Sequence, residues 1–323
     1  MKPFTYLRAT TVEEAVAEGS RPGAKFLGGG TNLVDLMRGG IEHPSTVVDL
    51  NRLPLDRVEE LPDGGLRVGA LVRSARLAAH PLVRERYPLV ADALLAGASP
   101  QLRNMATVGG NLMQRTRCPY FYDLAARCNK RAPGAGCDAT GGPGNTAALL
   151  GGGAACVAVH PSDLCVALVA QEAVVVATGP GGTRRVRIGD FHLPPGDTPH
   201  VETGLAADEL ITSVELPPPH PGRAAFRKVR DRASYAFALV SVAASLAVRD
   251  GAVADVRLAL GGVATVPWRA HEAERALLGA RADEAAFETA ARAELAGAAS
   301  EPRHAARAAL ARRTLVAVLR SLA

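Results

Sequence analysis

Most of the cysteine in this sequence lies in one region. Cys118, Cys128 and Cys137 fall within the stretch RCPYFYDLAARCNKRAPGAGC, and Cys156 follows in the Gly-rich segment behind it. Nine, eight and 18 residues separate these four cysteines. The chain has five cysteines, an odd number, and it begins without an export signal, so we do not expect a disulfide framework. Metal or redox chemistry is the remaining expectation for these thiols.

Four thiolates can hold either a structural zinc ion or an iron–sulfur cluster. Zinc ribbons usually supply their cysteines in pairs about two to four residues apart, which this sequence does not do. A four-iron four-sulfur cluster is also held by four cysteines, and it accepts widely spaced ligands from a loop rich in Gly and Pro. Spacing alone leaves zinc, an iron–sulfur cluster and buried thiols without a metal as open alternatives. The fifth cysteine, Cys165 in LCVAL, is interpreted as a buried small hydrophobic residue.

Two glycine-containing stretches could hold the phosphates of a nucleotide. LGGGTN, residues 27–32, lies where an apolar run gives way to a helical pattern, and ATVGGNL, residues 106–112, supplies a second Gly pair. Gly lets a phosphate approach the backbone, and a helix N-terminus offers unpaired N–H groups. The first stretch is neither G-x-G-x-x-G nor a Walker loop, so a structural turn is the alternative. A large dinucleotide such as FAD, spanning two subdomains, could use both stretches.

Capping residues and periodicity predict the elements that position the first glycine stretch. Thr11 and Glu14 form a capping-box pattern that opens a short helix. A strand, the glycine loop, a helix and a second strand are then expected over residues 24–50. This order would place the glycines between a strand and the start of a helix.

The rest of the chain is expected to form short strands, a few helices and a separate C-terminal unit. Strands are predicted over GLRVGA, AVVVAT and RRVRI, and a longer helix over LVADALLAGAS. The proline-rich residues 217–222 mark a domain boundary. Beyond it, two strands flank an Asp250-Gly251 turn, and helices are expected from about Trp268 to the end.

Composition excludes several other classes of protein. A length of 323 residues, with 48% hydrophobic and 21% charged residues, predicts two or three packed globular units. The net charge of +5 is spread over every segment instead of forming a basic stripe, which argues against nucleic-acid binding. No apolar run approaches the roughly 18 residues that a membrane span needs.

The order of four motifs resembles one protein family over essentially the whole chain. KFLGGGTNLVDLMR, ATVGGNL, HPSDLCVAL and FRKVRDRASYAFALVSVAASL occur in the order and approximate spacing of the FAD-binding medium subunit of the molybdenum-containing hydroxylases, the xanthine dehydrogenase and aldehyde oxidoreductase family. The resemblance implies an α+β fold, with a two-subdomain FAD-binding fold of the vanillyl-alcohol-oxidase type over residues 1–217. Its subdomains would cover about 1–54 and 55–217, and a smaller α+β domain of antiparallel sheet and helices would cover 223–323.

The resemblance also assigns FAD contacts. The first loop would wrap the pyrophosphate, the second would contact the phosphate and ribityl part, Asp163 would accept hydrogen bonds from ribityl hydroxyls, Ile211 would pack near the isoalloxazine ring, and Lys228 would lie close to the flavin. For Asp163 and Lys228 the alternative is a solvated surface charge. The complete set is Phe26, Leu27, Gly28, Gly29, Gly30, Thr31, Asn32, Leu33, Thr107, Gly110, Asn111, Asp163, Ile211 and Lys228.

The cysteines fall in an insertion relative to typical members of that family. The insertion, about residues 113–158, separates GGNL from PSD and is similar to one that binds a four-iron four-sulfur cluster in the flavin subunit of a periplasmic aldehyde oxidoreductase branch. The resemblance therefore implies Cys118, Cys128, Cys137 and Cys156 as cluster ligands. Nearby cations either offset the charge of the cluster or solvate the loop. The aromatic run 120–122 shields the cluster, packs against the edge of the flavin, or forms a small core of the loop itself. These cations are Arg115, Arg117, Arg127, Lys130 and Arg131.

The implied activity is electron transfer inside a larger oxidoreductase. In that family a molybdenum cofactor on a large subunit oxidises aldehydes or heteroaromatic rings, and two-iron clusters on a small subunit deliver electrons to the FAD, which passes them to an external acceptor. No residue of this chain is expected to act as a catalytic acid or base. The alternatives are a flavin subunit like that of 4-hydroxybenzoyl-CoA reductase and a non-redox nucleotide-binding module with structural zinc. A cytoplasmic location is expected, with periplasmic co-export by a partner subunit as the alternative.

Overall fold

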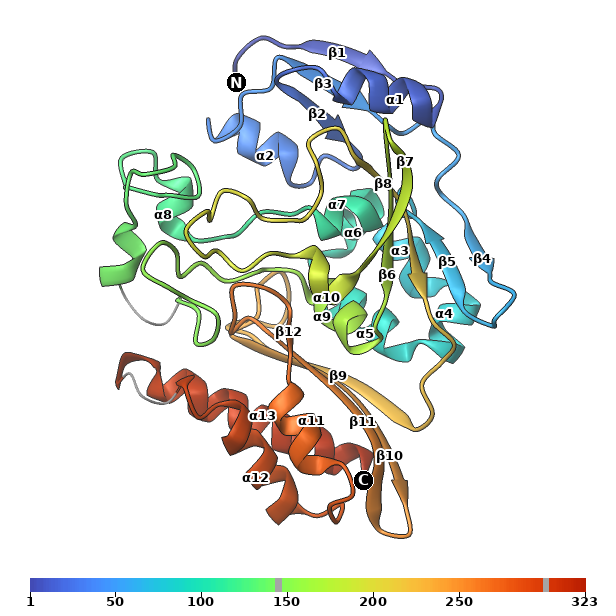
Figure 1. The fold of residues 1–323 in the computed structure, drawn as a ribbon, viewed down its shortest axis with the longest axis vertical. Coiled ribbons are helices and arrows are strands. Elements are labelled where there is room, and N and C mark those ends of the chain that lie inside the picture. The colour runs from blue at the N-terminus through green and yellow to red at the C-terminus, as the bar shows by residue number, and fades with distance from the viewer. Residues whose placement is uncertain (143–146, 299–301) are drawn as a thin grey trace.

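A computed structural model describes residues 1–142, 147–298 and 302–323. It combines helices with three separate sheets, and the cysteine insertion lies to one side of them (Figure 1). Two sheets and a group of short helices belong to the first two thirds of the chain, and the last sheet with its helices belongs to the final third. No helix in the described ranges is both long and apolar enough to cross a membrane.

The N-terminal unit is a small parallel sheet with the strand order β1-β3-β2. Helix α1 begins after Thr11, whose side chain accepts from the Glu14 N–H, and the Glu14 carboxylate accepts from the Thr10 N–H. The capping prediction is therefore confirmed, except that the Glu14 carboxylate binds the N–H of Thr10 and not that of Thr11. The predicted strand, loop, helix and strand are also confirmed. The elements are β1 (Thr5–Arg8), α1 (Val12–Gly19), β2 (Ala24–Leu27), α2 (Leu33–Arg38) and β3 (Thr46–Asp49).

A five-stranded antiparallel sheet follows, with the order β4-β5-β8-β6-β7. Short helices pack against it around the largest apolar core of the molecule. The strands are β4 (Val58–Glu60), β5 (Leu66–Gly69), β6 (Val174–Gly179), β7 (Gly182–Arg187) and β8 (Leu210–Leu216). The helices are α3 (Ser74–Ala79), α4 (Pro81–Arg86), α5 (Pro88–Ala96), α6 (Pro100–Met105), α7 (Val108–Leu112), α9 (Asp163–Ala170) and α10 (Ile188–Phe191).

The C-terminal unit is a four-stranded antiparallel sheet between two helical layers. Helices α5 and α9 of the preceding unit contact its strands, and the C-terminal helices pack against it to enclose a second core. The predicted hairpin is confirmed, because Asp250 and Gly251 both take positive φ (51° and 76°) between β10 and β11. The elements are β9 (Arg223–Val229), β10 (Val240–Arg249), β11 (Ala252–Gly261), β12 (Trp268–Arg269), α11 (His271–Leu277), α12 (Glu284–Glu294), η3 (Pro302–His304) and α13 (Ala305–Leu322).

One boundary in this unit was predicted wrongly. Trp268 does not begin a helix but pairs with Leu260 as part of β12 at the edge of the sheet. Its indole N–H donates to the buried Glu294 carboxylate at 2.7 Å. This contact with α12 ties the edge strand to the helical layer, and no local sequence pattern reports it.

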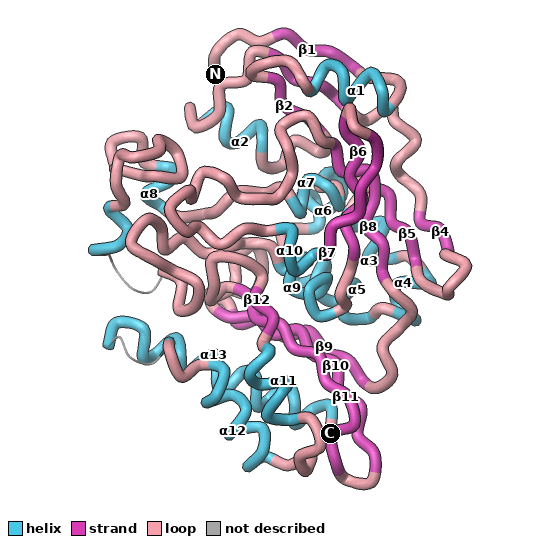
Figure 2. The backbone as a smooth tube through the Cα atoms, in the orientation of Figure 1, coloured by secondary structure: helices cyan, strands magenta, loops and turns pink. Residues whose placement is uncertain are grey.

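The insertion contains little regular structure. Figure 2 shows it mainly as loops, and its short helices are α8 (Pro119–Tyr122) and the 3₁₀ turn η1 (Asp138–Gly141). Phe121 is fully buried against Leu36 of α2 and Cys128, which supports the interpretation of the aromatic run as a core of the loop. Residues 143–146 of the predicted insertion lie outside the described residues.

Candidate functional site

The two glycine stretches pack directly against each other. A Cβ atom added at Gly29 would lie 1.9 Å from the Met105 carbonyl oxygen, and one added at Gly28 would lie 2.7 Å from Thr107 Oγ1. Gly30 has a φ of +75°, which side chains rarely tolerate. Glycine is therefore required here for the close approach of two backbone segments, and the first loop is not a simple surface turn.

Polar side chains at the end of β3 brace this contact. Asn51 donates from Nδ2 to the Gly28 carbonyl at 2.9 Å, and its backbone N–H donates to Asp49 Oδ1 at 2.9 Å. Arg73 donates to Asn51 Oδ1 at 2.8 Å and also to the Met105 carbonyl. The brace thus connects both glycine stretches. Sequence reasoning missed Asn51 and Arg73, and the only available signal was the position of Asn51 just after a buried strand.

Two adjoining cavities meet at the glycine stretches. One has a volume of about 680 Å³ and the other about 550 Å³, and both are lined by Thr31, Asn32, Gly110 and His160. The predicted FAD residues all line one or both of them. The larger cavity is lined by Thr31, Asn32, Gly110, Asn111, Asp163 and Lys228. The smaller cavity is lined by Phe26, Leu27, Gly28, Gly29, Gly30, Thr31, Asn32, Leu33, Thr107, Gly110 and Ile211.

An unpaired donor lies where the cavities meet. Asn32 Oδ1 accepts the Arg115 N–H at 3.0 Å, whereas its Nδ2 is buried and has no hydrogen-bond partner among the described residues. A buried donor without a partner carries a substantial desolvation penalty. Asn111 Oδ1 accepts from Ser162 Oγ at 2.6 Å and from Gln114 Nε2 at 2.9 Å. An anionic ligand such as a pyrophosphate fits this junction, because it would satisfy the Asn32 amide.

A buried ion pair closes the larger cavity. Lys228 Nζ on β9 lies 2.7 Å from Asp163 Oδ2 at the start of α9, and the side chains are 3% and 8% exposed. Lys228 also donates to the Ala96 carbonyl at 3.2 Å. Burial raises the pKa of Asp163, and the nearby charges of Lys228 and Arg230 oppose that rise. Neither residue is the solvated surface charge that was the alternative.

Ile211 lies in a different place from Lys228. It is buried in β8 and lines the smaller cavity, whereas Lys228 and Asp163 line only the larger one. Contact of Ile211 with the isoalloxazine ring and a position of Lys228 close to the flavin both stay predictions, and they concern different cavities of the cleft.

The four insertion cysteines converge. Cys128 and Cys137 face each other across an antiparallel bridge. Cys118 packs against the apolar cluster that contains Cys128 and against a second cluster that Cys137 also contacts. Burial raises the pKa values of Cys118 and Cys156, and for each of them interaction with other insertion cysteines adds to the rise. All the cysteines are free thiols. Cys165 lies outside the insertion, near the start of the buried helix α9, where desolvation raises its pKa to about 12.

The cations of the insertion form specific contacts. Arg115 lies 2.6 Å from a Glu42 oxygen and 3.1 Å from a Glu202 oxygen, and Lys130 lies 2.8 Å from Glu202. Arg131 donates to the carbonyl oxygens of Tyr120 and Phe121 at 2.9 and 2.8 Å, and also to a third carbonyl, that of Ala126. The carboxylates balance much of the positive charge. These side chains therefore fix the loop more than they create an excess charge around the thiols.

Comparison with known proteins covers the chain almost from end to end. Residues 2–219 match the FAD binding domain in molybdopterin dehydrogenase, and residues 224–321 match the CO dehydrogenase flavoprotein C-terminal domain. This chain belongs to the FAD-binding medium subunits of the molybdenum hydroxylases. The medium subunit is thus part of an oxidoreductase, and the predicted resemblance and fold class are confirmed.

Individual relatives agree with this assignment. The medium subunit is 55% identical over 279 residues to the aldehyde oxidoreductase FAD-binding subunit PaoB of Escherichia coli K12, covering 86% of each chain. It is 26% identical to the glyceraldehyde dehydrogenase medium chain of Sulfolobus acidocaldarius, covering 85% of this chain and 81% of that one. A solved structure of carbon monoxide dehydrogenase from Hydrogenophaga pseudoflava matches with a TM-score of 0.76 and 27% identity, covering 100% and 98% of the two chains.

Proposed function

We propose that this medium subunit is the FAD and iron–sulfur electron-transfer subunit of a molybdenum hydroxylase complex that oxidises aldehydes. The observation that carries the proposal is the pair of cavities joined at the glycine stretches, with the unpaired Asn32 amide at their junction. The aldehyde substrate is supported by 55% identity to a subunit named for aldehyde oxidoreductase. Its proposed partners are a large molybdenum-cofactor subunit and a small subunit with two-iron clusters.

The residues of the cleft suit an extended dinucleotide. We infer that a pyrophosphate lies at the junction, where glycine backbone and the Asn32 amide are close to the ligand, and that one ring system occupies each cavity. When bound, FAD accepts electrons singly and can release them as a pair.

The ion pair at the end of the cleft has a defined role in this proposal. Because Asp163 and Lys228 neutralise each other, they provide hydrogen-bonding groups without a large net charge. Their burial also keeps water from that wall of the cavity. Lys228 comes from the C-terminal unit, so the proposed flavin site needs both units of the chain.

We further propose one four-iron four-sulfur cluster held by Cys118, Cys128, Cys137 and Cys156. Tetrahedral zinc with thiolate bonds of about 2.3 Å would place its sulfur atoms about 3.8 Å apart. In the described part of the chain, the ligand groups found within 4.8 Å of one another are those of His160, Cys165 and His192, and the insertion cysteines form no such group. The proposal of a cluster rests on the presence of four cysteines in one loop region, two of them paired across the Cys128–Cys137 bridge.

The test is a visible spectrum with iron, zinc and acid-labile sulfide analysis of the anaerobically purified protein and a Cys128→Ser variant. We expect about four irons and four sulfides per flavin. The variant should lose iron and sulfide but keep the flavin, whereas the matched Cys165→Ala variant should keep all three. One zinc per chain without sulfide would refute the cluster and leave the flavin proposal intact, and a protein without flavin would refute the flavin proposal.

A further inference from the structure

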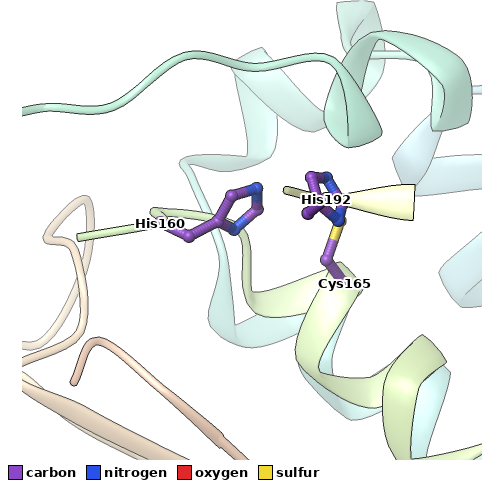
Figure 3. Close-up of side chains that lie close together, drawn as sticks. All are labelled: His160, Cys165 and His192. Atoms are coloured by element: carbon purple, nitrogen blue, oxygen red, sulfur yellow. The ribbon is translucent and has the colours of Figure 1, made fainter. Parts of the chain in front are cut away.

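Three potential metal ligands come together outside the cysteine insertion. His160 precedes α9, Cys165 lies within α9, and His192 follows α10. One ligand atom from each lies within 4.8 Å of the other two, and Figure 3 shows the side chains clustered at the start of α9. We propose that they bind one divalent transition-metal ion that prefers nitrogen and sulfur ligands, with Zn²⁺ as the best fit. This proposal does not depend on the flavin or on the cluster.

The environment of His192 orients it as a ligand. Its Nε2 lies 3.0 Å from the Leu112 carbonyl oxygen, which can only accept, so Nε2 carries the proton and Nδ1 keeps its lone pair. His192 Nδ1 is buried and has no hydrogen-bond partner among the described residues, and the residue is 6% exposed. Histidines that bind metals commonly donate their other N–H to a backbone carbonyl. His192 therefore already shows this arrangement.

His160 supplies the second imidazole. Its ring centroid lies 4.4 Å from that of His192, and its Nε2 is buried without a partner within the described ranges. Its Nδ1 accepts a long hydrogen bond from the Ser162 backbone nitrogen at 3.4 Å, so Nε2 carries the ring proton. Metal binding through Nε2 would move that proton to Nδ1 and give up this weak bond. Desolvation lowers the pKa values of both histidines, His192 to about 4, so both are neutral near pH 7.

Cys165 supplies sulfur from a site that water does not reach. The residue is fully buried, and its backbone N–H donates to Ser162 Oγ at 3.0 Å, which fixes the start of α9. Metal binding would form a metal–sulfur bond and release the thiol proton to solvent, while the neutral histidines release none. Affinity for the metal should therefore rise with pH.

The fourth coordination position would face the cleft. His160 and His192 both line the smaller cavity, whereas Cys165 lies behind them. A zinc ion bonded to nitrogen at about 2.1 Å and to sulfur at about 2.3 Å would draw the three ligand atoms closer together and leave one position open. Water or an anionic oxygen in the cavity could occupy that position. An ordinary buried thiol does not require two unpaired imidazole nitrogens beside it.

The test is titration of the purified protein, as isolated with its flavin and iron, with Co²⁺ or Zn²⁺. We expect one tight site per chain, a thiolate-to-cobalt charge-transfer band, and X-ray absorption at the zinc edge with one sulfur and two imidazole ligands. Cys165→Ala and His192→Gln should each weaken binding by at least about 100-fold. His200→Gln is the matched control, because His200 lines the same cavity but is outside the group.

Other outcomes would overturn the proposal. These are the absence of tight binding, a zinc site with only sulfur ligands, or affinity that both variants retain. Flavin content and thermal unfolding establish whether the variants fold. If Cys165→Ala fails to fold, the zinc-edge spectrum of the unmodified protein still decides the ligand set.

Discussion

The flavin cleft and the cysteine insertion are held together in different ways. Around the cleft, the loop between β2 and α2 lies so close to the end of α6 that Gly29 has no room for a side chain. In the insertion, Arg131 donates to three carbonyl oxygens of a loop with little regular structure. The first region is shaped by packing between helices and strands, and the second by side chains that satisfy loop carbonyls. We therefore expect the cleft to form without its ligand and the insertion to depend more on what it binds.

The largest effect is expected for Lys228→Met, which leaves Asp163 buried without its partner. The free energy of unfolding should fall by about 3–5 kcal/mol, and flavin should be lost while the iron of the proposed cluster is retained. Because burial raises the pKa of Asp163, the penalty should shrink as the pH falls and the carboxyl becomes protonated. Urea unfolding across pH, with flavin and iron analysis, measures this. The exposed neighbour variant Arg227→Met should change little, and a double Lys228→Met/Asp163→Leu variant should recover stability without recovering flavin.

A steric change tests the packing of the glycine stretches. Gly29→Ala places a methyl group against the Met105 carbonyl, so the loops must separate, at a cost of about 3 kcal/mol. We expect the flavin absorbance per chain to fall at least tenfold with iron unchanged. Gly189→Ala is the matched control, since nothing lies within 4 Å of its added Cβ. Full flavin content in Gly29→Ala would show that the two glycine stretches can separate without loss of the cofactor. Close backbone packing would then not be what shapes the cleft.

Arg131→Lys should lower the iron content and leave the flavin, the reverse of Gly29→Ala. An ammonium group cannot reach three carbonyl oxygens at once, so the loop that carries the cysteines is weakened. Because these contacts are only partly buried, the loss of two hydrogen bonds should cost about 1 kcal/mol each, or about 2 kcal/mol in all. Iron content should fall while flavin is retained. Arg127→Lys changes a guanidinium that is 71% exposed and should have little effect on either. If Arg131→Lys lost flavin before iron, the two regions would not be independent.

The smallest effect concerns the brace beneath the first glycine stretch. Burial alone would raise the pKa of Asp49, but hydrogen bonds from Tyr6 and Asn51 and the charge of Arg8 lower it overall. Its stabilising contribution is therefore present above about pH 4 and lost as the pH falls through the lowered folded pKa.

Asp49→Asn should cost about 1 kcal/mol at pH 7, and the difference from the unmodified protein should narrow in acid. Asp56→Asn, at a carboxylate that is 60% exposed, is the control for chemical denaturation measured from pH 3 to 7 (a range set by the roughly 3.9 pKa of an unperturbed Asp). If the difference in unfolding free energy between Asp49→Asn and the unmodified protein stayed the same from about pH 3 to 7, Asp49 would not act through its charge.

Local patterns predicted the parts of the site that local chemistry determines. The Thr11 cap, the strand before Gly28 and the Asp250-Gly251 turn all follow from neighbouring residues, and the structure has each of them. The glycine stretches were found for the same reason. Their mutual contact across nearly 80 residues was not predicted, because the Gly29–Met105 approach depends on how separate elements pack.

Burial also explains why the sequence did not reveal the group of side chains around Cys165. The residues of α9 are all buried, so the segment lacks the polar face by which a surface helix is recognised, and Cys165 was interpreted only as a small hydrophobic residue. Its position beside His160 and His192 depends on tertiary contacts. The Asp163–Lys228 pair likewise joins residues 65 positions apart, and motif order alone suggested that they share a site.

The position of Lys228 has a consequence for biosynthesis. When Asn32 and the glycine stretches leave the ribosome, the strand that carries Lys228 has not yet been translated. Asp163 and the Ala96 carbonyl then lack their partner, and that wall of the larger cavity is open. Domains commonly fold in order as the chain emerges. Stable retention of the cofactor should therefore begin only after β9 has joined the C-terminal sheet, which makes cofactor loading one of the last steps in the maturation of this subunit.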